Sequence, residues 1–111
     1  MVQQLNLVEM ERKYECISGV KAKDLMDNNN LKIIDIRDEE SFKEEHISNA
    51  ININDSNIQR FLDETSKDTP VLIYCYHGNS SKGAAEYFIS QGYEKVYSLD
   101  GGYSDYKKEF S

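Results

Sequence analysis

The residue with the clearest capacity for chemistry is Cys75, which ends an apolar run at 71–74 and precedes a short polar loop and a helix-forming segment. A thiol in that position faces backbone N–H groups of the loop and the positive end of the helix dipole. Such surroundings stabilise an anion and lower a cysteine pKa from about 8.5 into the range of roughly 3.5–7.5. The pattern therefore predicts a nucleophilic sulfur, although free cysteine is also common as a small core residue.

The loop around Cys75 carries groups that suit a bound anion. The candidate binding residues are Tyr76, His77, Gly78, Asn79, Ser80, Ser81 and Lys82. Gly78 permits positive φ, and successive N–H groups in such a turn form a concave anion site. Ser80 and Ser81 offer hydroxyl donors, but either could serve only as a helix cap. His77 and Lys82 could add positive charge or remain solvated surface residues. The loop has no acidic residue although the chain has a net charge of −7, which favours an anionic ligand or intermediate.

Strand and helix patterns alternate along the chain and predict the framework that positions this loop. Strands are expected at 14–17, 31–35, 50–53, 71–74 and 96–99. Helices are expected at 20–28, 39–45, 57–64, 81–91 and from Gly101-Gly102 to about Phe110. Ser18, Asp38 and Ser56 are the expected N-caps, and Gly92 is the expected helix stop. The alternation implies an α/β fold with one five-stranded parallel sheet and helices on both faces. Ligands bind beyond the carboxyl ends of such strands, where Cys75 stands.

Length and composition restrict the class of protein. The 111 residues, 39% hydrophobic and 30% charged, fit a single soluble domain. We expect residues 1–13 to be an N-terminal extension and 14–111 to be the domain. The net charge of −7 argues against nucleic acid and anionic membranes as partners. No apolar run approaches the roughly 18 residues of a spanning helix, and 1–13 contain no signal-peptide core. A cytoplasmic location is therefore expected.

The cysteines and histidines show no metal-ligand spacing. Cys16, Cys75, His46 and His77 are not paired at the short intervals that zinc sites use, so no metal is expected. No glycine-rich nucleotide fingerprint follows a strand, and no cofactor is predicted. A disulfide between the two cysteines is formally possible, but a reducing compartment favours two free thiols.

Three blocks of the sequence resemble the rhodanese family of thiosulfate sulfurtransferases. The blocks are the loop at 75–81 with Lys82-Gly83-Ala84-Ala85, the segment Asp35-Ile36-Arg37-Asp38 with Phe42, Glu45-His46-Ile47 and Ala50, and the segment Leu99-Asp100-Gly101-Gly102-Tyr103 with Tyr106. The similarity covers about residues 14–110. It is greatest to the single-domain bacterial type encoded with glycerol-3-phosphate metabolism genes, and it implies a single rhodanese-like domain with a five-stranded parallel sheet.

The resemblance also implies a reaction. Cys75 would attack the outer sulfur of thiosulfate, release sulfite and hold a persulfide, which cyanide, a thiol or a thioredoxin-like protein would then accept. Asp35 and Arg37 could orient the substrate from the edge of the sheet or form a structural ion pair, and we favour the ion pair. Tyr76 stands where many relatives have arginine, which implies weaker binding of thiosulfate.

Two other functions would use the same cysteine. Cysteine phosphatases of this fold need Cys-x5-Arg, because the planar guanidinium clamps the phosphoryl oxygens, and this chain has Ser81 at that position. A persulfide carrier or redox-sensing module that serves a protein partner also stays open, since it would need the same reactive thiol. A purely regulatory binding module is disfavoured because Cys75 and its loop are present.

Overall fold

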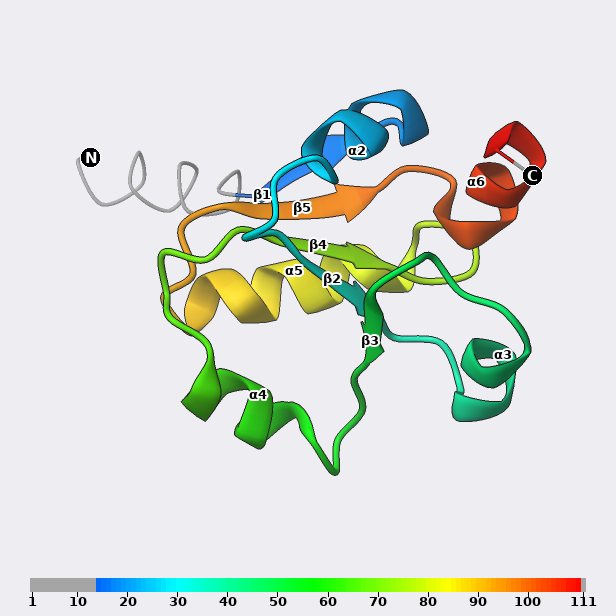
Figure 1. The fold of residues 1–111 in the computed structure, drawn as a ribbon. Coiled ribbons are helices and arrows are strands. Elements are labelled where there is room, and N and C mark those ends of the chain that lie inside the picture. The colour runs from blue at the N-terminus through cyan, green and yellow to red at the C-terminus, as the bar shows by residue number, and fades with distance from the viewer. Residues whose placement is uncertain (1–13, 111) are drawn as a thin grey trace, which may run out of the picture.

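The structure, a computed structural model, describes residues 14–110, so the expected extension at 1–13 lies outside the described residues. Strands and helices alternate along the described chain (Figure 1). The elements are β1 (Tyr14–Ile17), α2 (Gly19–Leu25), β2 (Lys32–Asp35), α3 (Glu39–Glu44), β3 (Ala50–Asn52), α4 (Ile58–Glu64), β4 (Val71–Tyr74), α5 (Ser80–Ser90), β5 (Val96–Leu99) and α6 (Gly102–Phe110).

The five strands form one sheet in the order β1-β5-β4-β2-β3, and every neighbouring pair is parallel. The strand that precedes Cys75, β4, is central, and all four of its residues are buried. A continuous apolar run suits a strand that is covered on both faces, which explains its sequence Val-Leu-Ile-Tyr. The predicted five-stranded parallel sheet is confirmed.

Helices cover both faces of the sheet, as predicted (Figure 1). On one face, Phe61 of α4 and Phe88 of α5 pack against Ile73 and other side chains of the sheet. On the other face, Ala22 of α2 and Tyr103 of α6 pack against a second apolar cluster that includes Leu72 and Leu99. Consecutive β4 residues alternate between the two clusters, because side chains along a strand point to opposite faces.

Several helix ends agree with the sequence. The Ser18 side chain accepts a hydrogen bond from Lys21 N at 3.2 Å, and the Asp38 carboxylate accepts one from Ser41 N at 3.1 Å. Both residues satisfy N–H groups that a first helical turn otherwise leaves without partners. Gly92 follows the end of α5 with φ of +98°, a conformation that suits the glycine predicted to stop this helix.

Two boundaries were predicted wrongly. Ser56 does not cap α4, because its hydroxyl donates to Asn54 Oδ1 at 2.6 Å, and Asn57 occupies the N-cap position instead. α2 ends at Leu25 rather than at Asn28, since Asn28 N bonds to the carbonyl of Leu25 at 3.0 Å and the chain leaves the helix in tight turns. At α4 a local side-chain hydrogen bond competes with the expected cap and shifts the boundary.

Candidate active site

Cys75 stands at the carboxyl edge of the sheet, directly after the central strand β4. The residue is only 5% exposed. Its Sγ accepts hydrogen bonds from the backbone N–H groups of Gly78, at 3.2 Å, and Ser81, at 3.3 Å. The predicted arrangement, a sulfur facing backbone donors at the start of α5, is therefore present.

The loop can curl around the sulfur because Gly78 has no side chain. Its φ is +94°, a region that residues with a Cβ rarely adopt. A Cβ added there would lie 2.9 Å from Gly101 N and 3.2 Å from the carbonyl oxygen of Leu99. Another residue at position 78 would push the loop away from β5, and the N–H group of residue 78 would lose its place beside the sulfur.

The surroundings of Cys75 favour its thiolate. Burial opposes ionisation, but hydrogen bonds from the hydroxyl and the N–H of Ser81, together with those from the N–H groups of Gly78 and His77, outweigh burial and lower the pKa of the thiol. The N-terminus of α5 adds the positive end of its dipole. A thiolate held in this way is the nucleophilic form of cysteine.

Ser81 has a role that differs from the predicted cap. Neither Ser80 nor Ser81 caps α5, because both lie inside its first turn, and the N-cap residue Asn79 makes no side-chain cap bond. The fully buried Ser81 hydroxyl instead lies 2.8 Å from the hydroxyl of Ser98 on β5. Ser98 was not among the site residues predicted from the sequence. A polar residue on an otherwise apolar strand, followed by the Asp-Gly-Gly block, is the signal that could have found it.

The N-terminus of α6 holds the backbone of the cysteine loop. Tyr103 N donates to the carbonyl of Cys75 at 2.8 Å, and Ser104 N donates to the carbonyl of Tyr76 at 3.0 Å. A Cβ at Gly102, whose φ is +61°, would lie 2.6 Å from the Cys75 carbonyl oxygen. The sequence suggested only that the two glycines lead into a helix, whereas the structure shows that they allow α6 to contact the site.

The other predicted loop residues lie at the surface. The Tyr76 ring is 43% exposed, and its hydroxyl contacts the Asp38 carboxylate and lies 2.7 Å from the hydroxyl of Ser41, which joins the loop to the start of α3. The remaining exposed residues are His77, Asn79, Ser80 and Lys82. The hydrogen bonds to the sulfur come instead from the backbone N–H groups of Gly78 and Ser81.

Asp35 and Arg37 form a buried ion pair beside the loop. The Arg37 guanidinium donates to both carboxylate oxygens of Asp35, at 2.8–3.2 Å, and to the carbonyl of Glu45 at 2.7 Å. Its Cζ also lies 4.3 Å from the centre of the Tyr103 ring. The guanidinium thus connects the end of β2 with the segment after α3 and with α6.

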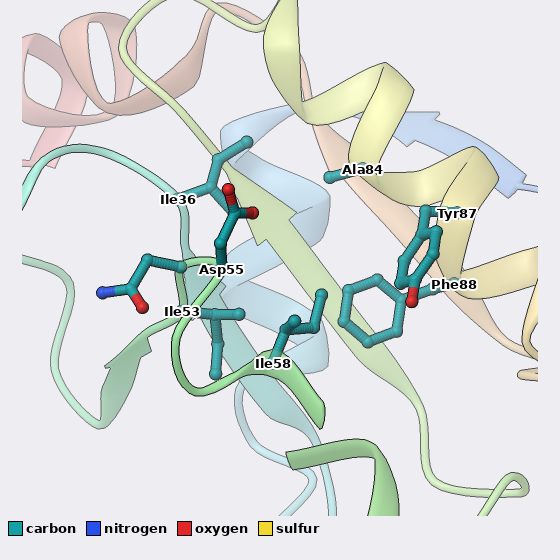
Figure 2. A pocket seen from close by; sticks show the side chains of 8 residues that line it. Ile36, Ile53, Asp55, Ile58, Ala84, Tyr87 and Phe88 are labelled. Carbon is teal, nitrogen blue, oxygen red and sulfur yellow. The ribbon is translucent and has the colours of Figure 1, made fainter. Parts of the chain in front are cut away.

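A separate cavity of about 550 Å³ lies between the loop before α4 and the α5 helix (Figure 2). It is lined by Ile36, Ile53, Asn54, Asp55, Ile58, Ala84, Tyr87 and Phe88. The lining is mostly apolar and its one charged side chain is the Asp55 carboxylate, whose negative charge disfavours an anion there. The site suited to a negative charge is therefore the loop around Cys75.

Three further features of the described residues concern their thiols, metal binding and membrane insertion. Cys16 on β1 is exposed, and both it and Cys75 are free thiols, as expected. Within residues 14–110, no group of three or more His, Cys, Asp or Glu side chains is placed to hold a metal ion. In the same range, none of the helices has the length and apolar character needed to cross a membrane.

Comparison with known sequences shows which family this chain is similar to. The model of the rhodanese-like domain matches residues 18–109. The thiosulfate sulfurtransferase GlpE of Coxiella burnetii is 40% identical over 94 residues, which cover 85% of this chain and 88% of that protein.

Solved structures share the fold. A rhodanese-related protein from Thermoplasma volcanium superposes with a TM-score of 0.74 at 24% identity and covers 87% of this chain and 94% of its own. A protein from Rhodopseudomonas palustris, described as a possible tyrosine phosphatase, superposes with a TM-score of 0.75 at 21% identity and covers 93% of this chain and 86% of its own. At these identities the likeness concerns the fold alone.

Proposed function

The chain belongs to the rhodanese family, and from this premise we propose that it is a sulfurtransferase in which Cys75 carries the transferred sulfur as a persulfide. The observation that supports the proposal most directly is the pair of N–H groups, from Gly78 and Ser81, that donate to Cys75 Sγ at the start of α5. Those donors suit a sulfur that carries negative charge during the reaction.

Thiosulfate is the proposed donor, because the relative from Coxiella burnetii is named a thiosulfate sulfurtransferase. The Cys75 thiolate forms a bond to the outer sulfur of thiosulfate. The sulfur–sulfur bond of thiosulfate breaks, and its electron pair leaves with sulfite. The product is a persulfide whose outer sulfur carries the negative charge, next to the N–H groups of the loop and the N-terminus of α5.

The second half-reaction returns the enzyme to its starting state. A nucleophilic acceptor such as cyanide, a thiolate or the thiolate of a thioredoxin-like protein attacks the outer sulfur. The electron pair of the persulfide bond returns to Cys75 Sγ, and the thiolate forms again. Because the donor product leaves before the acceptor reacts, the proposal predicts ping-pong kinetics.

Phosphatase chemistry is the weaker alternative. Ser81 occupies the position of the required arginine, and its hydroxyl is engaged with Ser98 inside the protein. The arginines in residues 14–110 are Arg37, paired with buried Asp35, and Arg60, paired with Glu64 on the surface of α4. Without a guanidinium at position 81, a phosphoryl group lacks its bidentate clamp. Robust hydrolysis of an aryl phosphate at mildly acidic pH would reverse this choice.

Intact-mass analysis after thiosulfate treatment tests the proposal. We expect a gain of one sulfur atom, mapped to Cys75, that disappears on addition of cyanide as thiocyanate forms. Cys75→Ser should lose both the adduct and sulfur transfer while keeping the fold. Cys16→Ser, which alters the exposed thiol of β1, is the matched control and should retain most activity. Thiocyanate formation at a normal rate by Cys75→Ser would contradict the proposal.

The same protein can be assayed for its alternative role as a carrier. An enzyme for small acceptors turns over many times with thiosulfate and cyanide, whereas a carrier discharges slowly to them and rapidly to a protein thiol. We expect multiple turnovers with cyanide and parallel lines in double-reciprocal plots. A single sulfur released per chain would favour the carrier.

A further inference from the structure

We propose that Ser98 is a positioning residue for Cys75: its hydrogen bond with the Ser81 hydroxyl fixes the first turn of α5, so that the Ser81 N–H stays in place to donate to the reactive sulfur. The proposal deepens the proposed function, because it concerns the same thiol. Its test measures ionisation of that thiol, which can be read whether or not sulfur transfer occurs.

The three side chains are brought together by the sheet. Ser98 on β5 is the register partner of Ile73 on β4, and Cys75 follows Ile73 by two residues. Side chains of register partners, and of residues two apart along an extended chain, lie on the same face. That face is covered by α5, which supplies Ser81. The Ser81 and Ser98 hydroxyls are 2.8 Å apart, and both residues are at most 1% exposed.

The position of Ser98 is one where an apolar residue would pack well. Val96, two residues earlier on the same face, belongs to the apolar cluster beneath α5. Burying a hydroxyl in such a place costs free energy unless it is hydrogen-bonded, and a bonded hydroxyl contributes little more than an apolar side chain of similar shape. Packing therefore gives no reason for serine here, whereas the contact with Ser81 does.

The contact ties the first turn of α5 to β5. The Ser81 N–H donates to Cys75 Sγ at 3.3 Å, and the hydroxyl of the same residue lies 2.8 Å from the hydroxyl of Ser98. A serine hydroxyl can both donate and accept, so the two hydroxyls bond to each other whichever of them donates. Ser98 therefore holds Ser81 at the place from which its N–H reaches the sulfur.

This support acts when charge returns to the sulfur. As the acceptor removes the outer sulfur, the electron pair of the persulfide bond moves to Cys75 Sγ, which is the leaving group. Thiolates of lower pKa leave faster. Because Ser81 and Ser98 are both buried and already bonded to each other, the Ser81 N–H need not reorganise as the charge develops.

The test is the pH dependence of alkylation of Cys75 by iodoacetamide in a Cys16→Ala background. Cys16 is the register partner of Ser98 on β1, and alanine there adds no hydroxyl beside Ser98. We expect Ser98→Ala to raise the apparent pKa of Cys75 by about half a unit to one unit and to slow alkylation below that pKa about threefold to tenfold. Ser98→Thr keeps the hydroxyl and should stay within about twofold of the parent. If Ser98→Ala fails to fold, as judged by circular dichroism, Ser98→Val takes its place.

A double-mutant cycle separates positioning from packing. Since Ser98 acts through Ser81, the Ser81→Ala protein should show a pKa shift at least as large as Ser98→Ala, and the double variant should match Ser81→Ala. The proposal is overturned if Ser98→Ala titrates like the parent, if Ser98→Thr shifts as much as Ser98→Ala, or if the two shifts add. If thiosulfate treatment of the parent protein formed no persulfide on Cys75, the proposed function would be contradicted, but this titration would remain valid.

Discussion

The backbone N–H of Tyr103 donates a 2.8 Å hydrogen bond to the carbonyl oxygen of Cys75. The contact joins the start of α6 to the nucleophile loop, and the absence of a side chain at Gly102 makes the close approach possible. The loop is thus held from two sides, by α5 through the sulfur and by α6 through the backbone. Rigid support of this kind keeps donors in place before the charge develops.

Gly102→Ala should therefore lower both the stability of the protein and its rate of sulfur transfer. The added Cβ would lie 2.6 Å from backbone atoms of Cys75 and Tyr76, and alanine is strained at a φ of +61°. We expect the free energy of unfolding to fall by at least about 1–3 kcal/mol, together with a loss of sulfur-transfer rate. Urea denaturation and steady-state assays measure the two effects.

Gly83→Ala is the matched control. Gly83 lies inside α5, and a Cβ there would meet nothing within 4 Å. Because alanine favours the helix and has fewer unfolded conformations than glycine, stability should rise by about 0.4–1 kcal/mol. Equal effects of the two substitutions would show that α6 does not hold the loop in the way described.

Ionisation of Cys75 should occur at lower pH in the native protein than in the unfolded chain. Its native pKa is lowered by hydrogen bonds from Ser81, Gly78 and His77 despite the opposing effect of burial. In Cys16→Ser protein, the iodoacetamide rate should reach half its maximum at a lower pH without urea than in denaturing urea.

The same shift has a consequence for stability. Because the folded pKa of Cys75 is depressed, the thiolate contributes stability that is fully present above the unfolded pKa of about 8.5. That contribution is lost as the pH falls through the folded pKa. The difference in free energy of unfolding between Cys16→Ser and the double variant Cys16→Ser/Cys75→Ser should therefore grow with pH across this window. A difference independent of pH would rule out the stabilised thiolate.

Arg37→Ala should destabilise the protein strongly, because it leaves the carboxylate of Asp35, which is 0% exposed, without its partner. Breaking a buried pair from one side typically costs about 3–5 kcal/mol. Arg37→Lys keeps the charge but cannot donate in the same bidentate geometry, so an intermediate loss is expected. Urea unfolding followed by circular dichroism provides the measurement.

Arg60→Ala is the comparison for Arg37. Arg60 forms an exposed pair with Glu64 at 3.6 Å on α4, and such pairs contribute only about 0.3–0.5 kcal/mol.

A loss of rate in Arg37→Lys without loss of stability would favour substrate orientation over the structural ion pair.

Lys82→Gln tests whether the exposed cation in the first turn of α5 attracts the donor. One exposed charge on the helix that follows the cysteine loop acts through water, so the KM for thiosulfate should rise only about twofold to fivefold, with kcat little changed. The effect should vanish near ~1 M salt, where charges are screened over about 3 Å. Lys95→Gln, at the opposite edge of the sheet before β5, should leave KM unchanged. An equal rise in both variants would indicate the net charge of the protein rather than a local effect.

The sequence alone determined the alternation of strands and helices, the position of Cys75 after an apolar strand, and the caps at Ser18 and Asp38. These features depend on interactions between residues a few positions apart, which periodicity and cap preferences report. Ser56 shows the limit of such reasoning, because a nearby asparagine side chain competed successfully for its hydroxyl.

Only the tertiary structure decided which distant residues complete the site. The contact between Ser81 and Ser98 and the bond from Tyr103 to Cys75 depend on the placement of β5 beside β4 and on the entry of α6 at the same edge. Strand order results from burial of the apolar faces of the whole sheet, which no local pattern specifies. The nucleophile could thus be found from its neighbours in the sequence, whereas its supporting partners required the arrangement of the complete sheet.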